Sequence, residues 1–241
     1  MQDSSAFKLF REQARYYSRR DQSAGFSPII PLFLNWVKKN KFNKPIVVAE
    51  FGGAAGQLLN QISKVYFKAT FINIEFIDDY KNKQVSNKIK FIQGSILNSG
   101  IASKSFNCII IRDVLHHLVG KNYLDSLNNQ KKALEELKRL IKPGGAIFIE
   151  ELINESVYAA KIIYYLSKLN SIIGIRSKPL QITPYTVLAF LTPHNLTIIC
   201  QEIFGKDSII SQEFQISNNN WKTRLVHLGF RSGKLILVIA N

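Results

Sequence analysis

Two adjacent histidines, His116 and His117, close a short turn after an apolar run, and two charged residues, Arg112 and Asp113, precede them. The ordinary pKa of an imidazole is near 6.5, so either ring can take a proton from a hydroxyl group at neutral pH. Alternatively, one of the two rings packs against the following helix or caps it. His116, His117 and Asp113 are therefore candidate catalytic residues of an acid–base site.

A second group of residues that could take part in binding surrounds a glycine turn in PIVVAEFGGAAGQLLNQI, residues 45–62. The β-branched run before Glu50 suits a strand covered on both faces. Gly52, Gly53 and Gly56 let the backbone turn sharply, take up positive φ and approach a ligand closely. The apolar spacing that follows indicates a helix, whose N-terminus carries free N–H groups and partial positive charge. Strand, turn and helix together predict a binding site for a nucleoside cofactor.

The spacing of the glycines discriminates between nucleoside cofactors. The dinucleotide fingerprint G-x-G-x-x-G, counted from Gly52, meets Ala54 and Gln57 where it needs glycine. An acid-x-G-x-G-x-G pattern instead meets Glu50, Gly52, Ala54 and Gly56, with the alanine as one departure. This pattern resembles motif I of the class I methyltransferases that use S-adenosylmethionine. The extra methyl group of Ala54 bears on how closely a ligand can approach the loop.

Two further segments carry the same resemblance. SFNCIIIRDVLHHL, residues 105–118, resembles the family's F-D-x-V-x-x-x-x-x-L-H-H-L segment, with Asn107 in place of the usual aspartate. LIKPGGAIFIE, residues 140–150, resembles its L-K-P-G-G turn into the fifth strand. Basic residues end the preceding helix favourably, and Pro143 with two glycines stops it before the strand. The resemblance covers residues 45–151 and points to the broad group that includes the ubiquinone and menaquinone C-methyltransferases.

The resemblance implies how the methionine part of the cofactor is held. The backbone of the loop from Gly52 to Gly56, which includes Gly53 and Ala54, would contact the methionine amino and carboxylate groups. The guanidinium of Arg112 would join it, and Glu50 would act directly or through water. Orientation of an acceptor in line with the methyl group would then supply most of the catalysis.

The ribose and adenine contacts follow from the next two predicted strands. Glu75, with Phe76 beside it, lies at the carboxyl end of the strand predicted at 70–76, where a carboxylate can accept hydrogen bonds from both ribose hydroxyls. Asp78 and Asp79 are alternatives, although they also suit an exposed helix start. Gly94, Ser95 and Ile96 follow the strand predicted at 89–92. In the family an acid contacts the adenine amino group at the place of Ser95, and a hydroxyl makes a weaker hydrogen bond there.

A helix is predicted near the N-terminus, because Phe7, Phe10, Ala14 and Tyr17 share one face after the capping residues Ser4 and Ser5. It is either an amphipathic helix on the core or a lid. Related methyltransferases often cover cofactor and substrate with such a helix, which makes Tyr16, Tyr17 and Arg20 candidate lid residues. Tyr17 is included among the candidate cofactor-binding residues.

The chain is expected to form one methyltransferase domain over residues 1–241. Its expected parts are an N-terminal helical cap (1–44), a cofactor-binding core (45–151), an inserted helical lid (152–183) and the C-terminal part of the sheet (184–241). The fold class is α/β: a Rossmann-like, doubly wound, mostly parallel seven-stranded sheet with helices on both faces and one antiparallel strand near the end. Helices are predicted at 155–175 and from Thr183-Pro184, and strands at 196–204 and 234–240.

Composition limits the cellular setting and the partners. The 241 residues carry a net charge of +15, which suggests an anionic partner such as nucleic acid or a membrane surface. The lysines are scattered along the sequence, however, as on ordinary solvated surfaces, and only Arg15–Arg20 is a compact basic and aromatic cluster. Cys108 and Cys200 lie in apolar runs and are expected to be reduced core residues. No apolar run of bilayer length and no zinc-ligand spacing occurs, so a cytoplasmic enzyme without a metal site is expected.

The sequence therefore predicts an S-adenosylmethionine-dependent methyltransferase that acts on a small, hydrophobic acceptor at carbon or oxygen. A nucleic-acid methyltransferase is the first alternative, although Arg112–Leu115 differs from the N-P-P-Y motif of amino-methylating DNA enzymes. A non-catalytic protein that binds the cofactor or a partner chain is the second. The apolar helix at 155–175 suits a lid over a hydrophobic acceptor, a peripheral membrane contact, a dimer contact or the core. Monomer and homodimer both stay open.

Overall fold

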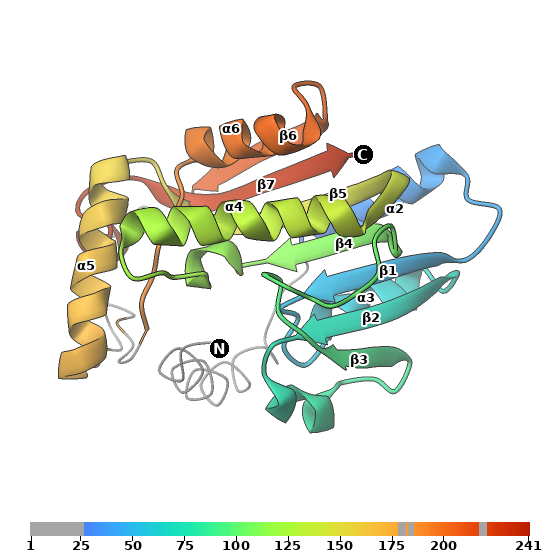
Figure 1. Cartoon of the computed structure of the whole chain (residues 1–241), viewed down its shortest axis with the longest axis horizontal. Coiled ribbons are helices and arrows are strands. Elements are labelled where there is room, and N and C mark those ends of the chain that lie inside the picture. The colour runs from blue at the N-terminus through green and yellow to red at the C-terminus, as the bar shows by residue number, and fades with distance from the viewer. Residues whose placement is uncertain (1–26, 178–181, 183–185, 217–220) are drawn as a thin grey trace. The chain divides into compact units, whose positions relative to one another are not determined.

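The computed structural model describes residues 27–177, 182, 186–216 and 221–241, and the seven strands in these ranges form one sheet in the order β3-β2-β1-β4-β5-β7-β6 (Figure 1). β1 pairs in parallel with β2 and β4, and β2 with β3. In Figure 1, β7 runs in the opposite direction to β1 and β4. The sheet is therefore mostly parallel with one antiparallel strand near the end, and the predicted Rossmann-like α/β fold is confirmed. The strands are β1 (Ile46–Phe51), β2 (Ala69–Glu75), β3 (Ile89–Gln93), β4 (Phe106–Arg112), β5 (Ile141–Asn154), β6 (Ile209–Ile216) and β7 (Ser232–Ala240).

Helices lie in front of and behind the strands, as α4 and α3 show in Figure 1. The apolar faces of α2 and α3 pack against β1 and β4 in one buried cluster, to which Phe33, Leu59, Val48 and Cys108 belong. Burial of this cluster is the main force that fixes α3 under the glycine turn. The helices are α2 (Ile29–Asn40), α3 (Gln57–Val65), α4 (Tyr123–Leu140), α5 (Val157–Ile173), α6 (Pro193–Phe204) and α7 (Trp221–Val226), with short 3₁₀ turns η2 (Asp78–Lys83) and η3 (Leu115–His117).

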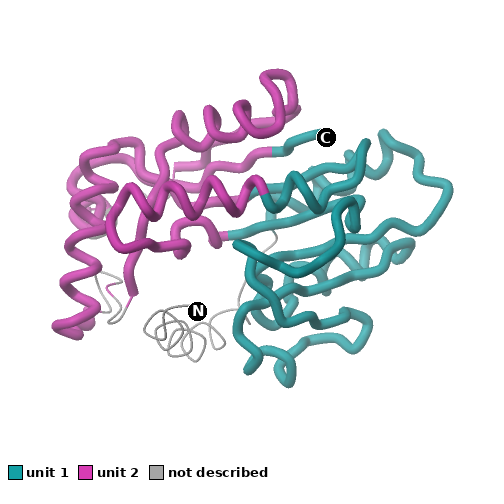
Figure 2. The backbone as a smooth tube through the Cα atoms, in the orientation of Figure 1, with its two compact units in different colours: residues 1–112, 136–149, 238–241 teal, residues 113–135, 150–237 magenta. Residues whose placement is uncertain are grey.

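The chain divides into two compact units (Figure 2). Unit 1 contains residues 1–112, 136–149 and 238–241, and unit 2 contains residues 113–135 and 150–237. The glycine loop, Glu75 and Arg112 belong to unit 1, whereas both histidines and Asp113 belong to unit 2. The candidate cofactor residues and the candidate acid–base residues thus fall in different units.

The strand predicted at 196–204 is wrong, because this segment lies in helix α6. Pro193 occupies its first turn, and the Thr192 hydroxyl accepts the N–H of Asn195 at 3.1 Å. Leu196 and Cys200 are buried four residues apart, on one side of the helix. The β-branched residues favoured a strand, but the Thr-Pro cap and the 3.6-residue period decide the local structure. The strand at β6, which follows α6, was not predicted.

Smaller differences concern the ends of elements. β5 begins at Ile141, directly after α4, so it includes the Lys-Pro-Gly-Gly segment that was predicted to precede it. It also continues to Asn154, inside the range predicted as a helical lid. The helix predicted at 155–175 is α5, which the Ser156 hydroxyl caps by accepting the N–H of Ala159 at 3.2 Å. Tyr16, Tyr17, Arg20, the cluster Arg15–Arg20 and Thr183-Pro184 lie outside the described residues.

Both cysteines are buried and free. Burial raises the pKa of the Cys108 thiol well above its ordinary value and that of Cys200 to about 12, so neither forms a reactive thiolate at neutral pH. None of the helices in the described ranges is long and apolar enough to span a bilayer.

Candidate functional site

The glycine loop follows β1 and turns through three residues with left-handed backbone. These are Gly52 (φ 70°), Ala54 (φ 48°) and Gly56 (φ 77°). Gly52 donates its N–H to the carbonyl of Ile74 at 2.9 Å, which ties the loop to β2, and Gly56 begins α3. Gly52 and Gly56 adopt this conformation readily because they have no Cβ atom, as the sequence predicted. Ala54 adopts the same left-handed conformation although it has a Cβ atom.

Three side chains hold the peptide groups of Ala54. Its N–H donates to Glu75 Oε2 at 2.9 Å. Its carbonyl accepts from Asn73 Nδ2 at 2.8 Å and from Gln84 Nε2 at 3.0 Å. These bonds stabilise the left-handed conformation, and they add Asn73 and Gln84 to the site. The signal for Asn73 was a single amide within the apolar strand β2, two residues before Glu75.

Gly53 fits closely between two buried polar side chains. A Cβ atom at this position would lie 2.6 Å from Asn73 Oδ1 and 2.7 Å from Glu50 Oε2, so only glycine is accommodated without displacement. Asn73 Oδ1 is buried and has no hydrogen-bond partner among the described residues, which leaves the site spare acceptor capacity. Glu50, at the end of β1, is also buried. The loop is thus packed directly onto the two strand ends.

Glu75 is buried at the carboxyl end of β2, as predicted. Besides Ala54, its carboxylate accepts the N–H of Ile77 at 3.2 Å through Oε1. Phe76 follows and packs against an apolar cluster of Ala55, Ile77 and Tyr80. Asp78 and Asp79 occupy the first turn of η2, which matches their expected alternative as helix-start acids.

Gly94, Ser95 and Ile96 form a turn directly after β3. Gly94 donates its N–H to the carbonyl of Glu75 at 3.0 Å, so this turn lies beside the end of β2. The Ser95 hydroxyl accepts the N–H of Leu97 at 3.2 Å, and the side chain of Ile96 is buried. Arg112 ends β4, which is the neighbour of β1 on its other side. The ends of four adjacent strands thus carry the candidate cofactor residues of unit 1.

In unit 2, the turn that contains the histidines is organised by a carboxylate that sequence reasoning missed. Glu151 lies near the end of β5 with 1% of its surface exposed, and its Oε1 hydrogen-bonds to His116 Nδ1. Its Oε2 accepts the N–H groups of Val114 and Leu115 at 3.1 and 2.7 Å. One buried carboxylate therefore fixes both the backbone of the turn and one nitrogen of His116.

The pKa values of the two histidines are shifted in opposite directions. Burial by itself lowers the pKa of the His116 imidazole, but the charge and the hydrogen bond of Glu151 outweigh it, and the pKa lies above its ordinary value. Burial and the neighbouring His116 instead lower the pKa of His117 well below its ordinary value. The ring centroids are 4.1 Å apart, and Phe190 packs on the other side of His116 at 5.6 Å. Of the two rings, His116 is the one whose Nδ1 is bonded to a buried carboxylate.

Asp113 takes part in an ion cluster. Its backbone is left-handed (φ 55°), and its Oδ2 lies 3.0 Å from the Nζ of Lys234. Lys234 also pairs with the buried carboxylate of Glu150. Burial opposes the charge of Lys234, yet the two carboxylates raise its pKa above the ordinary value. Lys234 comes from β7 and was not predicted, and it competes with any role of Asp113 as a free base.

The comparison with protein families gives one match, to the family described as methyltransferase domain, over residues 49–149. This range contains the glycine loop, both turns at the strand ends and the two histidines. No curated protein sequence matches the chain significantly.

Solved structures with the same fold include methyltransferases at low sequence identity. An arsenic(III) S-adenosylmethionine methyltransferase from Chlamydomonas reinhardtii has a TM-score of 0.60 at 14% identity, over 82% of this chain and 64% of that one. A chain in the complex of the Haloferax volcanii Trm112 methyltransferase activator with a methyltransferase has a TM-score of 0.59 at 9% identity, over 100% and 98%. An S-adenosylmethionine-dependent methyltransferase from Methanosarcina mazei has 0.59 at 10%, over 90% and 99%.

The present chain thus spans less than two thirds of the arsenic methyltransferase, and these likenesses establish the fold rather than a substrate. The family match adds evidence for methyl transfer that the fold alone does not give. It covers the glycine loop, the turn after β3 and the turn after β4. The family match thus assigns residues 49–149 to a methyltransferase domain, the solved structures show that the chain has the fold of S-adenosylmethionine-dependent methyltransferases, and both imply S-adenosylmethionine as the cofactor.

Proposed function

We propose that this methyltransferase acts on a small, hydrophobic acceptor, at an oxygen or a carbon from which a proton must be removed. The buried pair of His116 and Glu151 carries the proposal. A carboxylate that binds Nδ1–H of an imidazole leaves Nε2 as the nitrogen that accepts a proton. His116 is therefore the proposed base, and Asp113 and His117 are the further candidates on the acceptor side.

The residues of unit 1 have a donor and acceptor set that suits the cofactor. The buried carboxylate of Glu75, at the carboxyl end of β2, is the proposed acceptor for the ribose hydroxyls. Ser95 and Ile96 offer a hydroxyl and an apolar surface for adenine, and Arg112 offers a cation for the methionine carboxylate. Two further observations support the same assignment: Gly53 packs closely against Glu50 and Asn73, and the buried Oδ1 of Asn73 has no hydrogen-bond partner among the described residues. When bound, the cofactor supplies a methyl group that its sulfonium has already activated.

The hydrophobic class of the acceptor is supported by helix α5. Its buried side packs in an apolar cluster through Ala160, Ile163 and Tyr164. Its other side exposes large apolar residues, among them Tyr158 with 81% of its surface accessible. The helix contains no acidic residue. An apolar molecule that binds to it therefore does not have to remove water from a carboxylate, which would cost free energy.

Calorimetric titration with S-adenosylmethionine tests the cofactor residues. Glu75→Ala and Gly52→Val are both expected to abolish measurable binding. Asp78→Ala is the matched control, because this exposed acid lies only three residues from Glu75, and its affinity should stay within about twofold of the wild type. Equal losses in Glu75→Ala and Asp78→Ala would contradict the ribose assignment.

The pH dependence of methyl transfer tests the base. His116 accepts a proton only above its own pKa, which the charge of Glu151 raises. Glu151→Gln removes that charge, while the opposing charges of Asp113 and Lys234 and the neighbouring His117 stay. The acid limb of kcat should therefore move to lower pH, and the plateau should fall because the imidazole becomes a weaker base.

A panel of phenols, quinols and apolar lipids supplies the acceptors for this measurement. His116→Gln should lower kcat by about 10²–10⁴-fold at every pH without weakening cofactor binding. Glu155→Gln is the control for the carboxylate change, since Glu155 pairs with the exposed Arg231 and should leave the pH profile unaltered. An acid limb that stays fixed in Glu151→Gln would contradict the proposed role of the pair.

A further inference from the structure

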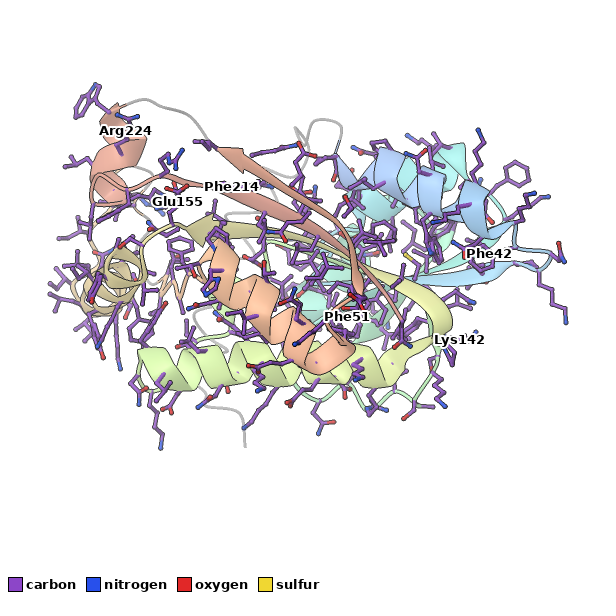
Figure 3. All side chains as sticks on the ribbon, turned by 90° about the horizontal axis from the view of Figure 1, so that it is seen from above. Phe42, Phe51, Lys142, Glu155, Phe214 and Arg224 are labelled. Atoms are coloured by element: carbon purple, nitrogen blue, oxygen red, sulfur yellow. The ribbon has the colours of Figure 1, made fainter. Side chains whose placement is uncertain are left out.

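The lysines of unit 1 are scattered along the sequence, but the sheet brings several of them to one edge. β3, β2, β1 and β4 are consecutive neighbours, and an exposed lysine lies within two residues of the start of each: Lys88, Lys68, Lys44 and Lys104. Because neighbouring strands lie about 4.8 Å apart, these four strand-start lysines span about 14 Å. We call this the amino edge of the sheet, and Phe42 and Lys142 mark the same end in Figure 3.

Hydrogen bonds fix the neighbourhood of these residues. Ile46 at the start of β1 donates its N–H to the carbonyl of Lys68 at 3.3 Å, and Lys104 donates its N–H to the carbonyl of Arg139 at 2.9 Å. The last turns of the helices add further cations at Lys38, Lys39, Lys64, Lys138 and Arg139. Helix dipoles account for cations in those last turns, but they do not account for the strand-start lysines, which lie outside the helices.

Four of the five described acidic residues of unit 1 lie away from this edge, and the fifth pairs with Arg139. Among its described residues, Glu50 and Glu75 lie at the opposite ends of the strands, and Asp78 and Asp79 begin η2. The fifth acid, Glu136, is bonded to Arg139 and to Ser99. None of the strand-start lysines forms an ion pair with a described residue, so in the described part of unit 1 their four positive charges are not neutralised by direct contact with an acid.

An aromatic side chain stands among these cations. Phe67 has 82% of its surface exposed and lies directly before Lys68, three residues after Lys64. A bare ring flanked by cations is a surface on which an unpaired base stacks. Val65 is the other large hydrophobic residue exposed in this stretch, so the edge lacks the broad apolar face with which amphipathic segments enter a bilayer.

We propose that the amino edge binds a single-stranded nucleic acid, with phosphates at the strand-start lysines and an unstacked base on Phe67. The glycine loop lies at the other end of β1, a strand of six residues that measures about 20 Å. The bound strand is therefore separate from the candidate cofactor site of unit 1, and this binding is an activity additional to methyl transfer.

Fluorescence anisotropy with labelled 20-nucleotide RNA and DNA of one mixed sequence, from 50 to 200 mM salt, tests the proposal. The quadruple variant K44Q/K68Q/K88Q/K104Q should bind about 200-fold more weakly than the wild type at 0.15 M salt. The slope of log K against log salt should fall by about 2.8, since each lost phosphate contact on a single strand contributes about 0.7. Phe67→Ala should weaken binding at least about fivefold and leave the slope unaltered.

Four exposed lysines of unit 2 provide the matched control, K132Q/K161Q/K168Q/K206Q, for which a change below about threefold is expected. Titration with S-adenosylmethionine shows that each variant is folded and separates this test from that of the proposed function. Binding of RNA, DNA or both supports the proposal, and the ratio of the two affinities shows which nucleic acid is preferred. Absence of binding at 50 mM salt, equal losses in both quadruple variants, or binding to phosphatidylserine vesicles without binding to either strand would overturn it.

Discussion

The left-handed backbone of Ala54 leads to a prediction about the free energy of unfolding, for which the neighbouring Ala55 serves as the control. Ala54 has φ 48°, whereas the adjacent Ala55 has negative φ and is buried. The left-handed region costs a residue with a Cβ about 1–2 kcal/mol relative to glycine. Replacement of Ala54 by glycine removes this cost, and the same replacement at Ala55 removes nothing unfavourable.

The expected magnitudes follow from three contributions. A glycine adds about 0.4–1 kcal/mol of conformational freedom to the unfolded chain in either variant. Ala55→Gly also loses a buried methyl group worth about 0.8 kcal/mol, so it should lower the free energy of unfolding by about 1.5 kcal/mol. In Ala54→Gly, the relieved strain offsets the entropy and a half-buried methyl, and stability should stay equal or rise by about 0.5 kcal/mol.

Differential scanning calorimetry of both variants measures the gap. A difference of about 1.5–2 kcal/mol corresponds to about 3–8 °C between their Tm values in a chain of this size. The two changes remove the same atoms from neighbouring residues, so errors in the entropy term cancel. Equal Tm values, or a larger fall in Ala54→Gly, would refute the view that Ala54 is strained and held by Glu75, Asn73 and Gln84.

Three further predictions concern single side chains. Thr192→Ala should cost about 1 kcal/mol, because α6 loses its capping hydroxyl, and calorimetry should find Tm unchanged in Thr192→Ser. Lys234→Met should cost about 3–5 kcal/mol in urea unfolding, because it removes the cation beside the buried Glu150 carboxylate; a loss below 1 kcal/mol would contradict this. Hydrogen bonds from Arg139 lower the pKa of Glu136 from 4.5 to about 2, so its stabilisation is full above pH 4.5 and is lost toward pH 2. The urea midpoint of Glu136→Gln should therefore fall less than that of the wild type between pH 5 and pH 3.

The parts of the fold that the sequence predicted carry dense local signals. The glycine loop combines an apolar run with glycines that turn the chain, and the last strand is a continuous apolar run. The misassigned segment α6 carries two competing signals, since its isoleucines favour a strand while Thr192 and Pro193 favour a helix start. The cap decides because it fixes the hydrogen bonds of the first turn.

The partners of the candidate site could not be predicted, because they depend on which strands become neighbours. Asn73 reaches the loop through the register that pairs it with Glu50, and Lys234 meets Asp113 across 121 residues of sequence. Glu151 was the last residue of the range that the resemblance covered, but its contact with His116 requires β5 to lie beside β4. Long-range pairing of this kind leaves no trace in local spacing.

The distribution of acids and lysines along the strands makes the described part of unit 1 an electric dipole, with its excess of positive charge at the start of the strands, because Glu50, Glu75 and the acids of η2 offset the cations at their ends. A dipole in the field of a polyanion experiences a torque that turns its positive end toward the negative charge. The glycine loop and Glu75 therefore point away from any anionic polymer that the unit approaches. Salt weakens this alignment beyond about 8 Å at physiological ionic strength, so orientation is gained only in the last steps of an encounter.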